Sequence, residues 1–562
     1  MMIRTLMSVL VFSMVTFHSH GGTPKLILQV TVDGLRADLI KRDANHFGEN
    51  GFNYLLREGV VYTNAHYQHA NTETIVGHTT LATGATPAVH GMIGNVWLNS
   101  ESGELGYNIE DAGAPLIPTR EHSAEGAQVD PSQLRARSSG RSPRGILAPT
   151  FSDTLCEHTV GKAKIFGISG KDRSAVAMAG KNGTAYWYST NNGDFQSSKY
   201  YMDKYPNWVE AWNKKRLAEK MAGQEWSLLH DASQYKLAHQ DDRPYEVDLK
   251  GYGRTFPHPY GPSQHPLFFT RVIVSPEGDR LLLDFGKALL EAEDLGQDEV
   301  TDYLSISFSS VDAVNHFFGP SSLENEDVVA QLDRTLDDLF TYVDKKVGLE
   351  NTLVIFSADH GMSDMPEYAA EQGKDAGRLY SDEILAMARE ISAEMFASEQ
   401  IVKDFFRPFL YLDSDILAGK GLSREKVSTA IAAELSKQPG IGGAVSSLDV
   451  LQGRVSGIDL AIRNNIHPQR SGDIYIYQKL NWFLFDRGAV AAMHGSPHRY
   501  DTHVPIIFAG GGIKPMTINR LVHPVDVAPT LSAWLGISPP GAAEGVALAE
   551  VRNQLAAPAP VR

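Results

Sequence analysis

Several charged side chains lie within a few residues after short apolar runs, and side chains of these types could bind a metal ion or an anion. Each run is rich in Val, Ile, Leu or Phe and is short enough to predict a buried strand. The charged residues and their runs are Asp33 after 25–32, Lys171 after 163–169, Asp312 after 303–308 and Asp359 after 352–357. Because ligands bind beyond the carboxyl ends of strands in open α/β sheets, we expect these side chains to share one site.

Histidines accompany two of these aspartates. His316 lies four residues after Asp312, so on a helix the two side chains share a face. They could bind one metal there or form an ordinary i,i+4 pair. His360 directly follows Asp359 and precedes a glycine, an arrangement that suits close packing of oxygen and nitrogen ligands around an ion.

A further histidine in a predicted loop is the last metal-ligand candidate. His494 precedes Gly495, and His498 and His503 stand close by. His503 enters a predicted strand, where a structural role is equally open. Taken alone, every candidate has an ordinary explanation; Asp33, for example, precedes a glycine and fits a turn.

Three aspartates and three histidines together predict a two-metal site, and the ligand types restrict the metal. Cys156 is the single cysteine, which excludes a thiolate cluster and an internal disulfide; we interpret it as a small buried apolar residue. Imidazole and carboxylate ligands fit catalytic Zn²⁺, and Mn²⁺ or Co²⁺ also fit by ligand type.

These ligands require a scaffold that brings strand ends together. Strands that alternate with helices predict an α/β fold, with a mostly parallel central sheet covered by helices on both faces. Beyond the four strands above, we expect strands at 60–63 and 504–508 and helices at 45–58, 72–83, 324–347 and 525–534.

The remaining segments predict the domain organisation. Arg4 and the apolar run to Phe17 are typical of a secretory signal peptide, so we assign 1–22 to it and expect a periplasmic or secreted protein. A catalytic domain over 23–555 would carry insertions near 190–300 and 366–490. Residues 119–145 predict a surface loop, and 556–562 a disordered tail.

The overall charge limits the partners. The chain has 562 residues, a net charge of −16 and a sequence pI near 5.7. An acidic surface argues against nucleic acid as the main partner, and no run after the signal peptide is long and apolar enough to span a membrane. The oligomeric state is open at this stage. An anionic substrate must be attracted by local positive charge.

In their shared order, seven short motifs resemble the alkaline phosphatase superfamily. Within it, the sequence is similar to the phosphate-irrepressible bacterial alkaline phosphatases, which are related to type I phosphodiesterases and nucleotide pyrophosphatases. The resemblance runs in segments from Leu26 to Leu535. The motifs are Val32-Asp-Gly-Leu-Arg36, Thr74-Ile-Val-Gly-His78, His90-Gly91 with Gly94-Asn95, Gly170-Lys-Asp-Arg173, Asp312-x-x-x-His316, Asp359-His-Gly-Met362 and His494-Gly-Ser-Pro497.

The resemblance implies a role for each residue. Thr74 would be the nucleophile and would contact one of two zinc ions. That zinc would be bound by Asp33, Asp359 and His360, and the other by Asp312, His316 and His494. The phosphoryl oxygens would be held by Asn95, Lys171 and Arg173. The implied activity is hydrolysis of small phosphate monoesters through a phosphothreonine intermediate.

Elementary chemistry agrees with these implied roles. A threonine hydroxyl is a weak nucleophile near neutral pH and needs activation, which metal coordination supplies. A monoester dianion carries more charge than a diester, so two cations and an amide at its oxygens favour monoesters. In isolation, Lys171-Asp172-Arg173 could equally be a solvated turn.

Three other classes remain to be weighed. A phosphodiesterase or nucleotide pyrophosphatase on the same metal core would not need the Lys-Arg pair. A sulfatase is disfavoured because Asn71-Thr-Glu-Thr74 lacks the Cys-x-Pro-x-Arg or Ser-x-Pro-x-Arg pattern. A metal-stabilised binding protein would not need the nucleophile Thr74 together with all the ligands.

Overall fold

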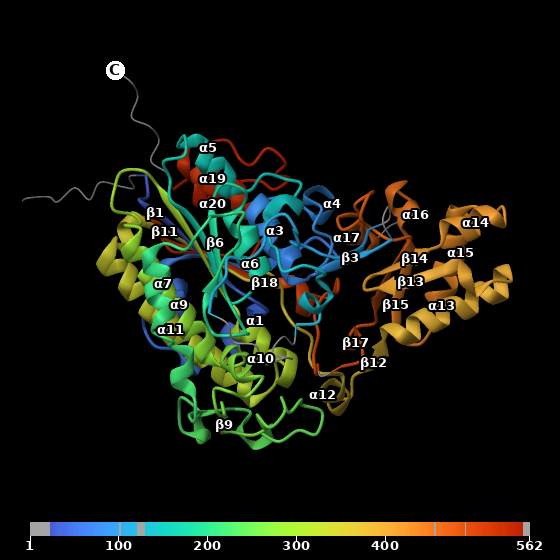
Figure 1. Cartoon of the computed structure of the whole chain (residues 1–562), viewed down its shortest axis with the longest axis horizontal. Coiled ribbons are helices and arrows are strands. Elements are labelled where there is room, and N and C mark those ends of the chain that lie inside the picture. Colours follow the sequence, from blue (N-terminus) through green and yellow to red (C-terminus); the bar gives the residue numbers. More distant parts are fainter. Residues whose placement is uncertain (1–22, 100–102, 121–129, 455–456, 489, 555–562) are drawn as a thin grey trace, which may run out of the picture.

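The chain folds around one large mixed sheet, with a smaller sheet to one side (Figure 1). The structure is a computed structural model that describes residues 23–99, 103–120, 130–454, 457–488 and 490–554. The predicted signal peptide 1–22 and the predicted tail 556–562 lie outside the described residues. Within the described ranges, no helix combines the length and the apolar character needed to cross a membrane.

The large sheet has nine strands in the order β19-β2-β18-β11-β1-β10-β5-β6-β7. Five consecutive strands in the middle of the sheet run parallel: β11, β1, β10, β5 and β6. In contrast, β18 pairs antiparallel with both β11 and β2. The strands are β1 Leu26–Val32, β2 Val60–His66, β5 Ile165–Ser169, β6 Thr184–Tyr188, β7 Phe195–Gln196, β10 Asp302–Phe308, β11 Thr352–Ser357, β18 His503–Gly510 and β19 Met516–Ile518.

The central strand β1 is buried on both faces, as its uninterrupted apolar sequence predicts. Leu28, Val30 and Val32 point into one hydrophobic core, while Ile27 points into the other. This alternation follows from the two-residue period of a strand. A central strand that is buried on both sides places the residue after its last position, Asp33, in the protein interior.

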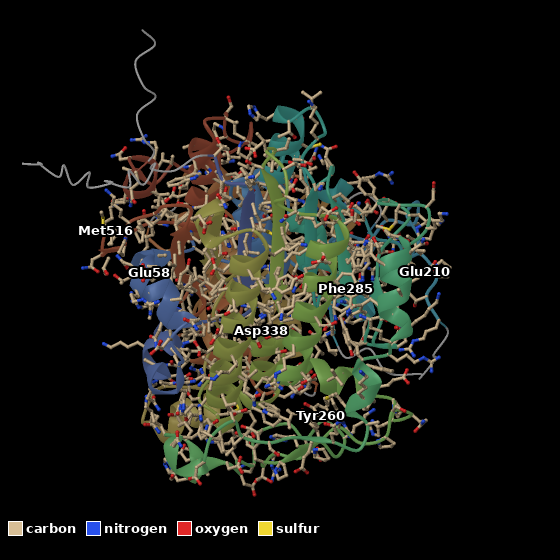
Figure 2. The ribbon with its side chains drawn as sticks, turned by 90° about the vertical axis from the view of Figure 1, so that its left-hand side faces the viewer. Glu58, Glu210, Tyr260, Phe285, Asp338 and Met516 are labelled. Carbon is tan, nitrogen blue, oxygen red and sulfur yellow. The ribbon has the colours of Figure 1, made fainter. Side chains whose placement is uncertain are left out.

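Helices cover both faces of the sheet, which confirms the predicted α/β class (Figure 1). One face packs against α1 Ala37–Arg42, α2 Phe52–Glu58, α9 Pro276–Ala292, α10 Ser310–Phe318 and α11 Leu323–Lys346. The other face packs against α3 Thr74–Thr83, α5 Phe151–His158, α6 Asp172–Ala179 and α19 Val527–Leu535. Figure 2 shows Phe285 of α9 and Asp338 of α11 on neighbouring helices of the first layer.

The helix expected at 45–58 is shorter in the structure. A 3₁₀ turn at Ala44–His46 is followed by an irregular stretch, and α2 begins only at Phe52. The physical cause is Asp333 of α11, whose carboxylate accepts hydrogen bonds from the backbone N–H groups of Gly48 (2.7 Å) and Phe52 (2.8 Å). This side chain caps the shorter helix and holds the chain ahead of it in another conformation.

The range 190–300 divides into two parts. Its beginning holds short elements, including α7 Asn207–Lys214 and α8 Phe268–Ile273. Its end is α9, whose apolar face packs on the large sheet; Phe285 stacks on Phe195 with ring centroids 4.1 Å apart. Because α9 covers the central sheet, it belongs to the layers of the main body.

Within 366–490 lies a separate antiparallel sheet with its own hydrophobic core. Two helices cover one side of it, and in Figure 1 this part stands to the right of the large sheet. The strand order is β13-β14-β16-β15. The elements are β13 Val402–Phe406, β14 Phe409–Leu412, β15 Ile441–Ser446, β16 Ile474–Gln478, α13 Ser381–Phe396 and α15 Arg424–Leu435. We call it the inserted sheet.

Candidate active site

Four adjacent parallel strands end together at one edge of the large sheet. Thr31 of β1 is in register with Ser307 of β10 and Ser357 of β11, and Ser307 is in register with Ser169 of β5. The residues that follow these four positions must therefore emerge side by side. This register brings together side chains that are more than 300 residues apart in sequence.

Asp33, Asp359 and His360, which we call the inner group, lie directly beyond β1 and β11. All three are fully buried. His360 Nε2 lies 3.3 Å from Asp33 Oδ1 and 3.3 Å from Asp359 Oδ2. The other oxygen of Asp359 accepts hydrogen bonds from the backbone N–H groups of Gly34 (3.1 Å) and His360 (3.0 Å), which fixes the orientation of the carboxylate.

Asp312, His316 and His494, which we call the outer group, lie beside the inner group. Asp312 and His316 share a face of α10, with His316 Nε2 3.4 Å from Asp312 Oδ2. His494 Nε2 lies 3.7 Å from Asp312 Oδ1. One potential ligand atom from each of these three residues lies within 4.8 Å of the others, and the same holds for Asp33, Asp312 and His360. Asp312 is thus within reach of both groups.

All three histidines are oriented in the same way. Nδ1 of His360 lies 2.7 Å from the carbonyl oxygen of Gly361, Nδ1 of His316 3.1 Å from that of Ala492, and Nδ1 of His494 2.8 Å from that of Thr72. A ring whose Nδ1–H donates to a carbonyl presents Nε2 as the ligand atom. Each Nε2 points toward carboxylate oxygens.

The carboxylates of both groups are poorly compensated by the protein alone. Both oxygens of Asp33, Oδ1 of Asp312 and Oδ2 of Asp359 are buried and accept no hydrogen bond, although Asp33 Oδ2 forms an ion pair with Lys171. Three buried carboxylates beside one lysine are costly unless further cations balance them. The residues present therefore fit a pair of divalent cations held by oxygen and imidazole nitrogen ligands, with no thiolate among them.

The pKa values reflect this crowding of charges. Burial disfavours the imidazolium of His360, but Asp359 and Asp33 outweigh burial and raise its pKa to about 9. Burial lowers the pKa of His494 well below its usual value. A metal ion bound by His360 must displace the proton held there, so that metal binding would release protons.

Thr74 lies at the point where α3 begins, and it is fully buried. Its Oγ1 is 3.5 Å from His360 Nε2 and accepts a hydrogen bond from Arg173 Nη2 at 3.4 Å. The helix expected at 72–83 thus starts at Thr74, and the positive end of a helix dipole favours an anion there. Gly77, one turn later, allows α3 to approach the inner group, since a Cβ there would lie 1.9 Å from the carbonyl oxygen of Asp359.

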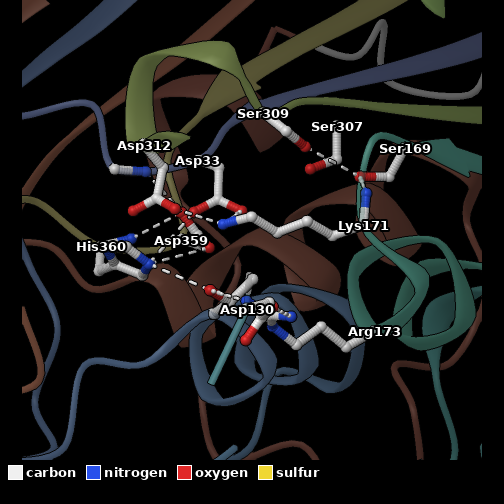
Figure 3. A network of polar contacts seen from close by, with 12 residues as sticks. Asp33, Asp130, Ser169, Lys171, Arg173, Ser307, Ser309, Asp312, Asp359 and His360 are labelled. Carbon is white, nitrogen blue, oxygen red and sulfur yellow. Dashed lines mark hydrogen bonds and ion pairs between the residues drawn. The ribbon is translucent and has the colours of Figure 1, made fainter. Parts of the chain in front are cut away.

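Lys171 and Arg173 both point into the site, but each already has carboxylate partners (Figure 3). Lys171 Nζ pairs with Asp33 Oδ2 at 2.9 Å and with Asp312, so that it lies between the inner and outer groups. Burial opposes the charge of Lys171, but the two aspartates outweigh it and raise its pKa. Lys171 therefore remains a cation at the site.

Arg173 is held by a residue that the sequence analysis placed in a surface loop. Its Nη1 pairs with Asp130 Oδ2 at 2.5 Å, as Figure 3 shows. The segment from Asp130 to Ser139 also lines a cavity of about 990 Å³ beside the site. Its composition, rich in Ser, Arg and Gly, gave no signal for this contact, because the position of the loop depends on the fold of α6.

Asn95 lines the same cavity as Arg173. Its Oδ1 accepts a hydrogen bond from the backbone N–H of Ile75 at 3.3 Å, which directs the amide beside the start of α3. The backbone N–H of Asn95 donates to Glu73 Oε2 at 2.5 Å. Glu73 is a second residue that the sequence analysis did not single out, although it directly precedes Thr74.

The other histidines near the motifs have further partners. His78 belongs to α3; its Nδ1 lies 2.9 Å from the carbonyl oxygen of Thr74 and 3.1 Å from Asp359 Oδ2, and its Nε2 lies 2.8 Å from Ser307 Oγ. His503 Nε2 bonds to the carbonyl oxygen of Thr63 and His498 Nε2 to that of Gln478. Of the three histidines at 494–503, it is His494 that the fold brings to the aspartates.

Comparisons with known proteins confirm the family that the resemblance indicated. Residues 27–501 match the family described as type I phosphodiesterase / nucleotide pyrophosphatase. The chain therefore belongs to this family.

Two relatives match nearly the whole chain. The chain is 31% identical over 535 residues to alkaline phosphatase PafA of Elizabethkingia meningoseptica, covering 94% of each sequence. It is 32% identical over 543 residues to alkaline phosphatase PhoV of Synechococcus elongatus, covering 95% of this chain and 94% of PhoV. A crystal structure of wild-type PafA superposes with a TM-score of 0.86 and 30% identity, covering 95% of this chain and 99% of that one.

Proposed function

We propose that this protein is an alkaline phosphatase that hydrolyses phosphate monoesters, with Thr74 as the nucleophile and two zinc ions in the inner and outer groups. The observation that carries the proposal is the shared orientation of His316, His360 and His494. Each ring directs Nε2 toward buried carboxylates of the two groups, and several oxygens of these carboxylates accept no hydrogen bond. The names of the two relatives support the same activity.

The proposed reaction has two steps at Thr74. Oγ1 attacks phosphorus and the alcohol leaves, which forms a phosphothreonine. Water entering through the cavity then attacks this phosphothreonine, phosphate departs, and the hydroxyl of Thr74 is restored. Zinc ions in the two groups would supply charge that favours the deprotonated nucleophile and stabilises the entering and leaving oxygens.

The protein itself supplies the binding of the phosphoryl group. Arg173 Nη2 already contacts Thr74 Oγ1, so its guanidinium lies where non-bridging phosphoryl oxygens would meet the nucleophile. Lys171 has three N–H donors; two face Asp33 and Asp312, which leaves one for the substrate. The amide of Asn95 would complete the set. These donors would stabilise the charge of a monoester dianion in the transition state.

We also propose that the protein acts outside the cytoplasm, in the periplasm or as a secreted enzyme. The support is the charged and apolar N-terminal sequence, which is typical of a signal peptide. Expression of the full chain followed by N-terminal sequencing of the exported protein tests this; recovery of uncleaved protein only in the cytoplasm would contradict it.

A paired activity assay tests the proposed function. The zinc-loaded protein is given an aryl phosphate monoester and the matching diester, each with and without a chelator. We expect monoester hydrolysis to be the faster, with both activities lost on chelation and regained with zinc. A higher diester rate would favour a phosphodiesterase instead, and full activity in the chelator would exclude the metal mechanism.

A further inference from the structure

Arg407 of the inserted sheet reaches the active site. It lies in the turn between β13 and β14, 334 residues after Glu73, yet its guanidinium is buried against the main body. Only 8% of the residue is exposed, and it lines the cavity beside the site. The proposed reaction assigns no role to this cation.

The guanidinium holds two parts of the site at once. Nη2 donates to Glu73 Oε1, and Nη1 donates to the carbonyl oxygen of His494 at 2.6 Å and to that of Leu484 at 3.3 Å. A planar guanidinium presents its donors in a fixed fork, so that the positions of its partners depend on one another. Glu73 and His494 are thereby held at a set separation.

The contact to Glu73 continues to the residue proposed to bind phosphate. The second oxygen of Glu73 accepts from the backbone N–H of Asn95 at 2.5 Å, and Oδ1 of the Asn95 side chain accepts from the backbone N–H of Ile75 at 3.3 Å. Since Oδ1 is engaged by the backbone, the Nδ2 group of Asn95 is the part left to bind a ligand. Arg407 thus supports the backbone that carries this side-chain amide, through one buried carboxylate.

The loop after His494 is shaped around the same guanidinium. A Cβ on Gly495 would lie 3.0 Å from both Nη1 and Nη2 of Arg407. Gly495 also has a φ of +101°, a conformation that side chains with a Cβ rarely adopt. The glycine after the histidine therefore lets Arg407 approach the carbonyl of His494 closely.

We propose that Arg407 is a positioning residue, which fixes the Asn95 amide through Glu73 and fixes His494 through its carbonyl oxygen. The proposal rests on the proposed function, in which Asn95 binds the phosphoryl group and His494 binds metal. It gives the inserted sheet a role in catalysis, because its β13–β14 turn carries the guanidinium that contacts Glu73 and His494.

The test is a double-variant comparison on the full zinc-loaded chain. Arg407→Met removes the donors and keeps the apolar stem. We expect kcat/KM for an aryl phosphate monoester to fall by about 10-fold or more, and the binding of inorganic phosphate, measured by calorimetry, to weaken in parallel. In an Asn95→Ala background the same change should cost less than about 3-fold, because coupled residues are not additive.

Arg470→Met is the matched control. Arg470 also joins the segment of the inserted sheet to the main body, donating to the carbonyl oxygens of Gly91 (2.6 Å) and Gly145 (2.9 Å), but it does not contact Glu73 or His494. We expect near wild-type kcat and KM for this variant. Two results would overturn the proposal: an equal loss of kcat/KM in both arginine variants, or an Arg407 effect that is unchanged in the Asn95→Ala background. Either would mean that Arg407 only attaches the inserted sheet to the main body.

Two further measurements keep the test decisive if Arg407→Met is unstable or if the protein shows no turnover. Arg407→Lys keeps a cation for Glu73 without the fork, and we expect it to restore part of the phosphate affinity lost in Arg407→Met. Crystal structures of the variants test positioning without turnover: a displaced Asn95 amide supports the proposal, and an unmoved amide and His494 overturn it. If wild-type protein neither binds phosphate nor hydrolyses monoesters, the proposed function fails, while this structural comparison still decides the positioning.

Discussion

The inner and outer groups differ in burial and in how the fold supplies them. Asp33, Asp359 and His360 of the inner group come from two adjacent strand ends and are fully buried next to Thr74. The outer group combines α10 with a loop, and the side chain of His316 is 22% exposed. His316 and His494, but not His360, line the cavity. In the proposed mechanism, the buried half would hold the nucleophile and the accessible half would meet the leaving group and water.

The largest expected effect is at the nucleophile on the inner side. Thr74→Ala should lower monoester turnover by at least about 10³-fold, since removal of a nucleophile abolishes the covalent route. Metal content should stay as in wild type, because the aspartate and histidine ligands remain. Thr74→Ser, which keeps a hydroxyl, is the control and should retain measurable turnover. Near-native activity of the alanine variant would remove Thr74 from its role.

A difference between the two groups should appear when one histidine from each is replaced. His360→Ala removes a buried ring that lies between two buried carboxylates, so we expect both lost zinc and a lower melting temperature. His316→Ala affects a partly exposed side chain, and we expect weaker zinc binding that added zinc restores. Metal titration and thermal unfolding of both variants measure this. Identical behaviour of the two would refute the contrast between a buried and an accessible half.

Lys171 lies between the groups and should affect substrate choice. Lys171→Ala should lower monoester kcat/KM by about 10²-fold, the range seen when one transition-state donor is removed, with a smaller loss for diesters. The ratio of the two kcat/KM values, measured with aryl substrates, should therefore narrow. An unchanged ratio would contradict the charge argument for monoesters.

The smallest effect is expected at Asp130, which contacts Arg173 from the cavity side. Asp130→Asn removes the ion pair and keeps the shape, so that Arg173 is less firmly oriented. Loss of a charged hydrogen bond of about 1.5 kcal/mol corresponds to about 10-fold in kcat/KM. Asp111→Asn, whose carboxylate pairs with exposed Arg144, is a control that should have no effect. A gain in activity for Asp130→Asn would mean that this carboxylate mainly repels the substrate.

The residues at the ends of the central strands could be predicted from the sequence, for a physical reason. The runs ending before Asp33, Asp312 and Asp359 are buried central strands, and such runs are continuously apolar and easily recognised. Parallel strands then place the following residues at one edge. The class of fold and the gathering of the ligand residues both follow from this single pattern.

Contacts between residues far apart in the sequence could not be predicted in the same way. Asp333 shortens a helix from 281 residues away, and Arg407 contacts Glu73 across 334 residues. Neither contact leaves a local pattern, because each depends on how separate layers pack. Asp130 was missed for the same reason: a polar loop has the same composition whether it faces solvent or a buried arginine such as Arg173.

The most direct test of the account is the location of metal in the zinc-loaded protein. Anomalous diffraction at the zinc edge should reveal two ions, one among Asp33, Asp359 and His360 and one among Asp312, His316 and His494. Lys171 should then be free of at least one of its aspartate contacts. A single peak, or no peak after zinc reconstitution, would contradict the two-metal site on which the proposed phosphatase mechanism depends.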